Sequence, residues 1–283
     1  MRLKKILLYS CTFWLFSLCV LLFAWNEKEA YTLKKTVGEL SLAVGLTPVQ
    51  RNLLFDYPKM MACMNRVIIK YNLRSEEDLS KLPVAGQRQF RQAEDIPVWN
   101  GVITETMQAI HTGRFDYRVP LFEKIREGQM WRLFSPALLH KDIIHLVFNM
   151  SWLWLLGLQI ERRLARVRFL LLVLLIGIFS NTAQYLMGGP YFLGFSGVVV
   201  GLTGFIWTRQ KKAPREAYPL PRATALFVFY FVLVMMGLEV VTVAAQAVFS
   251  IVIPLNIANT AHVVGGLAGL VLGRCVFFSR REI

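Results

Sequence analysis

The sequence predicts an all-α, polytopic membrane protein with six transmembrane helices and a small helical extramembrane insertion in the first outer loop. Three observations lead to this prediction. Hydrophobic residues make up 55% of the 283 residues and form several long runs, which an ordinary soluble domain does not need. Basic residues cluster beside these runs on alternate loops. A long polar stretch with the signals of short helices separates the first run from the second.

Six apolar segments are interpreted as membrane spans, at about residues 6–25, 143–160, 169–187, 196–208, 223–243 and 257–278. The first of them, with its basic start, also resembles a signal peptide. Its apolar run is longer than the ~7–15 residues of a usual signal peptide, and no small-x-small cleavage site follows it. We therefore expect residues 1–25 to remain as the first transmembrane helix.

The distribution of charge predicts how these spans are oriented. The net charge is +14, yet acidic and basic residues nearly balance in 26–130. The basic surplus lies in clusters beside the apolar segments, as at 162–168 and 209–222. Because cytoplasmic loops carry an excess of Lys and Arg, we expect both termini to be cytoplasmic and the lipid bilayer to be a partner. A nucleic-acid binder would gather its charge on one folded face, so no nucleic-acid partner is expected.

The polar stretch at residues 26–120 is predicted to be an extracytoplasmic helical insertion. Residues 121–283 then form the core, with an outer loop and five transmembrane helices. Within the insertion, Thr47 before a proline indicates a helix start, and Ser75 with an aspartate three residues later resembles a capping box. A further helix is expected to end at Gly113.

Polar side chains converge at the outer ends of three spans. In the predicted topology the second, fourth and sixth spans all run from outside to inside. His145 and Asn149 lie four residues apart on one face of the second span, Ser196 begins the fourth, and His262 lies early in the sixth. Ionisable residues are costly inside a membrane, so they are candidates for function.

The fourth span predicts how deep Ser196 lies. At ~1.5 Å per residue its helix reaches only about 20 Å, whereas the hydrocarbon core is about 30 Å thick. The glycine-rich stretch that ends at Gly194 must therefore enter the membrane as irregular backbone. Such backbone is tolerated only inside protein or beside a water-filled cavity. We expect Ser196 at the floor of a wet pocket and at a helix N-terminus.

Small residues would let the fourth and sixth spans approach each other closely. Each span carries three glycines on one side, namely Gly197, Gly201 and Gly204 on the fourth and Gly265, Gly269 and Gly273 on the sixth. Packing alone would explain either set. Because the two sets lie next to Ser196 and His262, they predict that these side chains meet.

A serine becomes a useful nucleophile beside a base, and His262 is the candidate. The Ser196 N–H, His145 and the Asn149 amide would supply donors for an oxyanion. Asp142 is expected at the surface and Glu239 near the outer end of the fifth span, so a Ser–His dyad is favoured over a triad. A transporter would need paired intramembrane charges or internal repeats, which are absent from the sequence.

A metal site is the remaining alternative for these side chains. His140, His145 and His262 could approach one another, but their spacing fits no common zinc signature and no carboxylate joins them. Isolated serines and histidines in membrane helices more often have structural roles. The combination of residues favours catalysis, without a metal or another cofactor.

Five motifs, in this order, resemble the rhomboid family of intramembrane serine proteases. A Trp-Arg pair in the outer loop is followed by the polar face of the second span, a Gly–Glu pair at its cytoplasmic end, a Gly-x-Ser-Gly string and a histidine followed by spaced glycines. The residues are Trp131-Arg132, His140-x4-His145-x3-Asn149, Gly157-x3-Glu161, Gly194-Phe195-Ser196-Gly197 and His262-x2-Gly265-x3-Gly269.

The resemblance implies a six-helix rhomboid bundle, in a bacterial inner membrane, that cleaves transmembrane protein substrates near their outer membrane entry. Carried over by position, Ser196 is the nucleophile, His262 the base, and His145 and Asn149 the oxyanion donors. The alternative is a catalytically inactive rhomboid-like protein that binds client membrane proteins. The motif residues with an implied structural role are Trp131, Arg132, His140, Glu161, Gly194, Gly197, Gly265 and Gly269.

Three features bear on this resemblance. Many members place an aromatic residue four positions after the serine to stack on the histidine, whereas this chain has Val200. The insertion before the Trp-Arg motif is unusually long. The family's mobile fifth span and its following loop correspond to 223–256, and the apolar part of that loop could cover the site.

Overall fold

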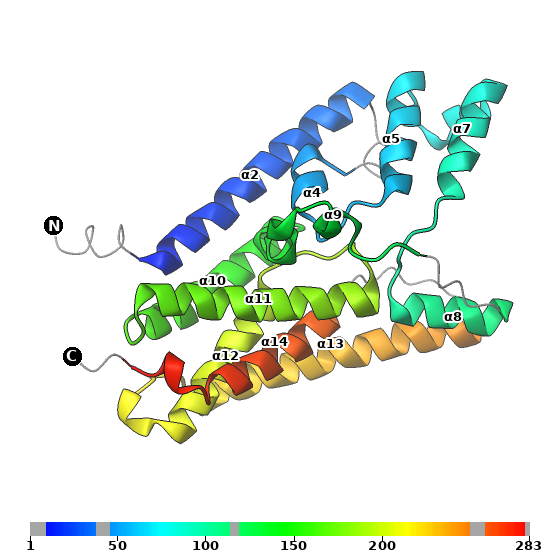
Figure 1. Ribbon diagram of the computed structural model, residues 1–283. Coiled ribbons are helices and arrows are strands. Elements are labelled where there is room, and N and C mark those ends of the chain that lie inside the picture. Colours follow the sequence, from blue (N-terminus) through cyan, green and yellow to red (C-terminus); the bar gives the residue numbers. More distant parts are fainter. Residues whose placement is uncertain (1–9, 38–45, 114–118, 250–257, 281–283) are drawn as a thin grey trace.

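The computed structural model describes residues 10–37, 46–113, 119–249 and 258–280, and every regular element in these ranges is a helix (Figure 1). The prediction of an all-α fold is confirmed. Of the apolar loop predicted at 244–255, the first part is wrong because residues 244–249 continue α13, and residues 250–255 lie outside the described residues. Helices occupy the positions of all six predicted spans. They are α2 (Cys11–Val37), α10 (Ile143–Glu161), α11 (Arg166–Gly188), α12 (Ser196–Lys212), α13 (Arg222–Phe249) and α14 (Asn259–Leu272).

Among the described helices, α10, α11 and α13 are long and apolar enough to cross a membrane, and α14 is a shorter apolar helix. The ends of four spans differ from the prediction, and two of these are the ends of α12 and α13, which continue past 208 and 243 to Lys212 and Phe249. α2 continues to Val37 instead of ending near residue 25, because charged residues propagate a helix as well as apolar ones do. The sixth span ends as α14 at Leu272, and a separate 3₁₀ turn, Val276–Phe278, follows it.

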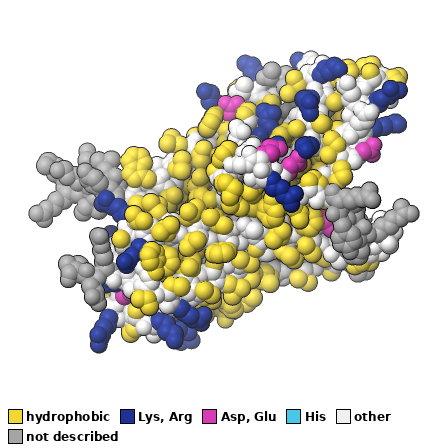
Figure 2. Space-filling model, viewed as in Figure 1, with side chains coloured by type: hydrophobic (Ala, Val, Ile, Leu, Met, Phe, Trp, Pro, Cys, Tyr) yellow, Lys and Arg dark blue, Asp and Glu magenta, His cyan; other side chains and the backbone are white. Residues whose placement is uncertain are grey.

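The core of the bundle surrounds α12. Large side chains from α10, α11 and α12, such as Leu153, Phe169 and Phe205, are fully buried there. In contrast, only 6% of the apolar stretch of α13 is buried, against 44% for α10 and 50% for α11. Figure 2 shows the consequence, a continuous hydrophobic surface along the bundle with Lys and Arg gathered toward its ends. This surface is suited to lipid.

The polar stretch forms short helices: α4 (Pro48–Leu53), α5 (Lys59–Tyr71), α6 (Glu76–Ser80), α7 (Val84–Glu94) and α8 (Val102–Thr112), followed by α9 (Glu123–Arg126). The predicted helix signals are confirmed. Thr47 caps α4 with its hydroxyl, the N–H of Ser75 donates to the carboxylate of Asp78, and α8 ends at Gly113 in the left-handed conformation.

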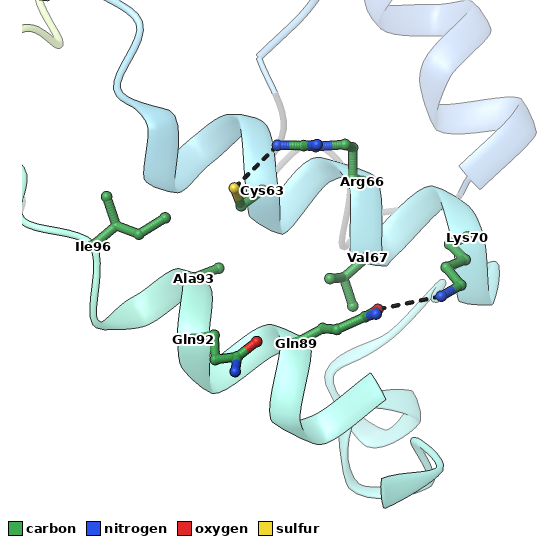
Figure 3. A pocket seen from close by; sticks show the side chains of 8 residues that line it. All are labelled: Cys63, Arg66, Val67, Lys70, Gln89, Gln92, Ala93 and Ile96. Atoms are coloured by element: carbon green, nitrogen blue, oxygen red, sulfur yellow. Dashed lines mark hydrogen bonds between the residues drawn. The ribbon is translucent and has the colours of Figure 1, made fainter. Parts of the chain in front are cut away.

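α5 and α7 pack as a pair with a small core of their own, which includes Ile68, Leu73 and Leu82. Figure 3 shows the open groove between them, of about 400 Å³, where Lys70 of α5 donates to the side chain of Gln89 of α7. Side chains of the pair therefore bury one another and do not depend on the membrane core.

Asp56 closes the base of this excursion. Its buried carboxylate accepts the backbone N–H groups of Glu123 and Lys124, at 3.0 and 3.2 Å, and the hydroxyl of Tyr185 in α11, at 3.1 Å. Phe55 stacks on Tyr185 with 4.5 Å between ring centroids. The chain thus leaves the membrane core and returns to it at one point. The division at residues 25 and 120 stays a prediction, but these contacts group α4 with the core. Residues 57–121 form an excursion that also touches α11, because the indole of Trp99 donates to the carbonyl oxygen of Tyr185 at 2.9 Å.

We expect a variant that lacks residues 57–121, rejoined by a short glycine linker, to fold. The two ends already meet at Asp56, and α4 with its contacts is retained, whereas the hydrogen bond from Trp99 to the carbonyl oxygen of Tyr185 is lost. The measurement is a cooperative thermal unfolding transition of the purified protein in detergent. The matched control removes residues 46–121, and thus α4, and should lose the transition. Aggregation of the first variant alongside the second would show that the core does not fold without the excursion.

Candidate active site

Ser196 and His262 lie in contact. Ser196 is the first residue of α12, and its Oγ is 2.8 Å from Nε2 of His262 in α14. The imidazole is 5% exposed, whereas the serine is half-buried. In the tautomer with an unprotonated Nε2, His262 can accept the hydroxyl proton of Ser196. This geometry is what a serine nucleophile and its base require.

Glycines bring the two helices together. A Cβ on Gly265 would collide with the carbonyl oxygen of Gly197, and one on Gly269 with that of Gly201. From the other side, a Cβ on Gly201 would lie 2.7 Å from the carbonyl oxygen of Gly265. α12 and α14 therefore touch backbone to backbone, as small-residue faces allow.

The segment before Ser196 is irregular, as its length predicts. Residues 189–195 form no helix, and Gly194 has φ +127°, a conformation that favours glycine. The N–H of Gly194 donates to the carbonyl oxygen of Pro136 at 3.0 Å. Phe192 packs with Phe55 in one cluster. The irregular backbone is thus enclosed by protein. The depth of Ser196 in a membrane and the access of water to it stay predictions.

His145 and Asn149 lie in the first two turns of α10, whose start is capped by Asp142. The His145 ring packs against Gly194, where an added Cβ would lie 2.6 Å from Cε1. Ser196 begins its helix two residues further on. Asn149 is 1% exposed, and its Nδ2 donates to the carbonyl oxygen of His145 at 2.9 Å. This hydrogen bond of the Asn149 side chain therefore stays within α10.

His140 lies beside His145, with 5.3 Å between ring centroids. It is 2% exposed, and burial lowers the pKa of His140 to about 4. A neutral, enclosed imidazole suits a packing role at the helix start. In the described part of the chain, no three His, Cys, Asp or Glu side chains come close enough to hold a metal ion.

Phe231 of α13 is a neighbour of His262 that carries no signal in the sequence. Its ring centroid lies 6.3 Å from that of His262. Val200, in contrast, lines with His262 a largely apolar cavity of about 560 Å³ between α12, α13 and α14. Phe231 lies in an apolar run with several other aromatic residues, so nothing in that run distinguishes it. The one sequence feature that points to another aromatic neighbour of His262 is the lack of an aromatic residue at position 200.

Residues 127–279, more than half of the chain, match the family model described as the Rhomboid domain. The chain belongs to the rhomboid family. Together with its apolar helices, this makes it an integral membrane protein with a helical rhomboid bundle.

Two relatives show how far the rhomboid similarity extends. Rhomboid protease GlpG of Yersinia pestis (strain Pestoides F) is 35% identical over 144 residues, which cover 51% of this chain and 47% of the relative. Rhomboid protease GlpG of Pectobacterium atrosepticum is 34% identical over 144 residues, with 51% and 48% covered. The chain therefore aligns with about half the length of the curated relatives that it matches.

The Trp-Arg pair of this rhomboid holds α4 in place. Arg132 is 3% exposed and donates to the carbonyl oxygens of Leu54, at 2.6 Å, and Arg51, at 2.8 Å. The indole of Trp131 donates to the carbonyl oxygen of Asn52 at 3.0 Å. These donors satisfy carbonyls at the end of α4 that lack partners within the helix. α4 in turn packs over the irregular segment before Ser196, because Leu54 and Leu193 belong to one apolar cluster.

Glu161 joins the first helix of the rhomboid bundle to the second span. At the end of α10, its carboxylate accepts the N–H groups of Cys11, at 2.6 Å, and Thr12, at 3.0 Å. It also accepts the hydroxyls of Ser10 and Thr12, each at 2.8 Å. A carboxylate at the N-terminus of α2 accepts from N–H groups that lack partners within the helix, and its negative charge interacts favourably with the helix dipole.

Proposed function

We propose that this protein is an intramembrane serine endopeptidase that cleaves transmembrane protein substrates near their outer membrane entry. The observation that carries the proposal is the 2.8 Å contact between Ser196 Oγ and His262 Nε2 at the start of α12. The rhomboid domain and the bacterial relatives named as rhomboid proteases support the same class of reaction. Residues 1–25 are proposed as the first span, 26–120 as the outer insertion and 121–283 as the catalytic core.

The proposed reaction proceeds through an acyl-enzyme. His262 takes the proton of Ser196 as Oγ attacks the scissile carbonyl carbon, and it then gives that proton to the leaving amine. Water, deprotonated by His262, hydrolyses the ester and restores the serine. The neutral dyad suffices for this proton balance, and no cofactor or metal is required.

The oxyanion of the tetrahedral intermediate needs fixed donors. We assign this role to the Ser196 N–H, to His145 and to the second amide hydrogen of Asn149. The packing of His145 against Gly194 supports its assignment, because that contact ties the imidazole to the backbone that leads into Ser196. The N-terminal end of α12 adds a favourable field for negative charge.

The proposed setting is a bacterial inner membrane with both termini cytoplasmic, which rests on the distribution of basic residues. The site then opens to the outer side, where water is available for hydrolysis. The alternative, an inactive protein that binds client membrane proteins, keeps the fold but needs no reactive serine.

Labelling with a fluorophosphonate probe tests the proposal. We expect the probe to modify Ser196 in the purified protein, because His262 raises the nucleophilicity of the hydroxyl. Mass spectrometry of the labelled peptide identifies the residue, and cleavage of a transmembrane reporter is followed in parallel. Neither labelling nor reporter cleavage in a folded preparation would favour the inactive, client-binding alternative.

A further inference from the structure

The face of α14 that carries His262 meets α13 at two levels. Asn259 lies three residues before His262 and so shares its helix face. At the first level, the buried Asn259 amide donates to the carbonyl oxygen of Met235 at 2.9 Å and to the carboxylate of Glu239 at 2.8 Å. At the second level, the Phe231 ring lies next to His262, with 6.3 Å between centroids.

Apart from these contacts and aromatic contacts with α10, α13 has little packed surface to fix its position. Only 6% of its apolar stretch is buried, and the cavity of about 560 Å³ separates much of it from α12 and α14. Gly237 has open space where a side chain would lie. With so little packed surface, the position of α13 depends strongly on the hydrogen bonds from Asn259.

Glu239 is costly where it lies, in the apolar stretch of a span, and such residues are candidates for function. Phe231, Met235 and Glu239 follow one another at four-residue steps, so they lie along one side of α13. The bond that fixes Glu239 against Asn259 therefore also sets the height of Phe231 against His262. The ring of Phe148 in α10 also contacts the Phe231 ring, with 5.7 Å between ring centroids.

We propose that Phe231 and Glu239 are positioning residues for His262. Glu239, through Asn259, holds α13 at the height where the Phe231 ring supports the imidazole beside Ser196. This inference rests on the proposed function of Ser196 and His262. It also explains how the imidazole is held when Val200 supplies no ring and borders a cavity.

Replacing Phe231 tests the ring contact. In Phe231→Leu we expect the rate constant of fluorophosphonate labelling and the kcat for a transmembrane reporter to fall about tenfold, at nearly unchanged KM. Phe231→Tyr retains a ring and should stay close to the parent. A loss in the tyrosine variant as large as in the leucine variant would overturn the role of the ring.

Phe227 provides the matched control. It lies one turn away on α13 and stacks on Trp152 of α10, with 6.0 Å between centroids, much as Phe231 contacts Phe148 of α10. Phe227→Leu should therefore weaken the contact between α10 and α13 while it leaves the labelling rate near that of the parent. Equal losses in Phe227→Leu and Phe231→Leu would assign the effect to general packing of α13 and refute the proposal.

Two substitutions of Glu239 test the outer contact. Glu239→Gln keeps an oxygen that accepts from Asn259 and should label at nearly the parent rate. Glu239→Leu removes that acceptor and should slow labelling severalfold. Because both residues act through one bond, Glu239→Leu combined with Asn259→Leu should be no slower than the slower single variant. Equal rates for the glutamine and leucine variants, or additive losses in the double variant, would contradict the role of the hydrogen bond.

The parent protein separates this inference from the proposed function. Absence of labelling at Ser196 in the folded parent would refute both. Labelling of the parent, with parent rates in Phe231→Leu and Glu239→Leu, would refute the positioning role alone. Rates are compared below the thermal unfolding midpoint of every variant, so that loss of fold is not read as loss of position.

Discussion

Ser196→Ala is expected to reduce cleavage of a transmembrane reporter by a factor on the order of 10⁴ or more while the protein stays folded. The substitution removes the attacking oxygen together with the hydroxyl proton that His262 would pass to the leaving amine. His262→Ala should cost about as much, because nucleophile and base act as a unit, and the double variant should be no worse than either single one. Initial rates of reporter cleavage in liposomes provide the measurement.

Ser151 supplies the control for this experiment. It also lies in a membrane helix, but its hydroxyl donates to the carbonyl oxygen of Val147 in its own helix at 2.8 Å. Ser151→Ala should retain the parent rate. Cleavage at the parent rate in Ser196→Ala would refute the assignment of the nucleophile, whatever the behaviour of His262→Ala.

Gly269→Ala is expected to lower both stability and activity strongly. The added Cβ would meet the carbonyl oxygen of Gly201, which is backbone and cannot move away without shifting α12 or α14. Overpacking of this kind costs about 3 kcal/mol or more, so the thermal unfolding midpoint should fall by roughly 10 °C. A shift of α14 by about 1 Å would also move His262 from Ser196 and slow cleavage roughly 100-fold.

Gly237 in α13 is the matched control, because a Cβ there meets no atom within 4 Å. Gly237→Ala makes the same chemical change in an exposed membrane helix, and better helix propensity should leave the midpoint equal or slightly higher. The thermal unfolding midpoints of both variants and the parent are measured by differential scanning calorimetry in the same detergent. An unchanged midpoint in Gly269→Ala would show that α12 and α14 are not held at backbone contact.

Much of the fold could be predicted because its signals are local. Apolar runs predict the spans, and Thr47 before a proline predicts the start of α4, since a capping side chain acts on N–H groups a few residues away. The extent of α2 could not be predicted in this way. Its helix continues beyond the apolar run to Val37, so the end of hydrophobicity did not mark the end of the helix.

The neighbourhood of Ser196 and His262 could be predicted in part. Glycines at regular spacing on two spans indicate close helix contact, and the structure brings Ser196 Oγ to 2.8 Å from His262 Nε2. The oxyanion assignment of His145 and Asn149 stays a prediction. The role of Phe231 had no pattern to reveal it, because a ring in an apolar run is equally suited to lipid and to an imidazole.

The local pattern of the chain thus defines its helices and names the side chains that could react. The folded arrangement adds what depends on residues far apart in sequence. Asp56 meets Glu123 where the excursion leaves and rejoins the core, and Asn259 meets Glu239 beside the candidate base. The physical reason is that capping and periodicity act within one or two helical turns. A buried hydrogen bond between distant segments, in contrast, exists only once the backbone has brought both partners together.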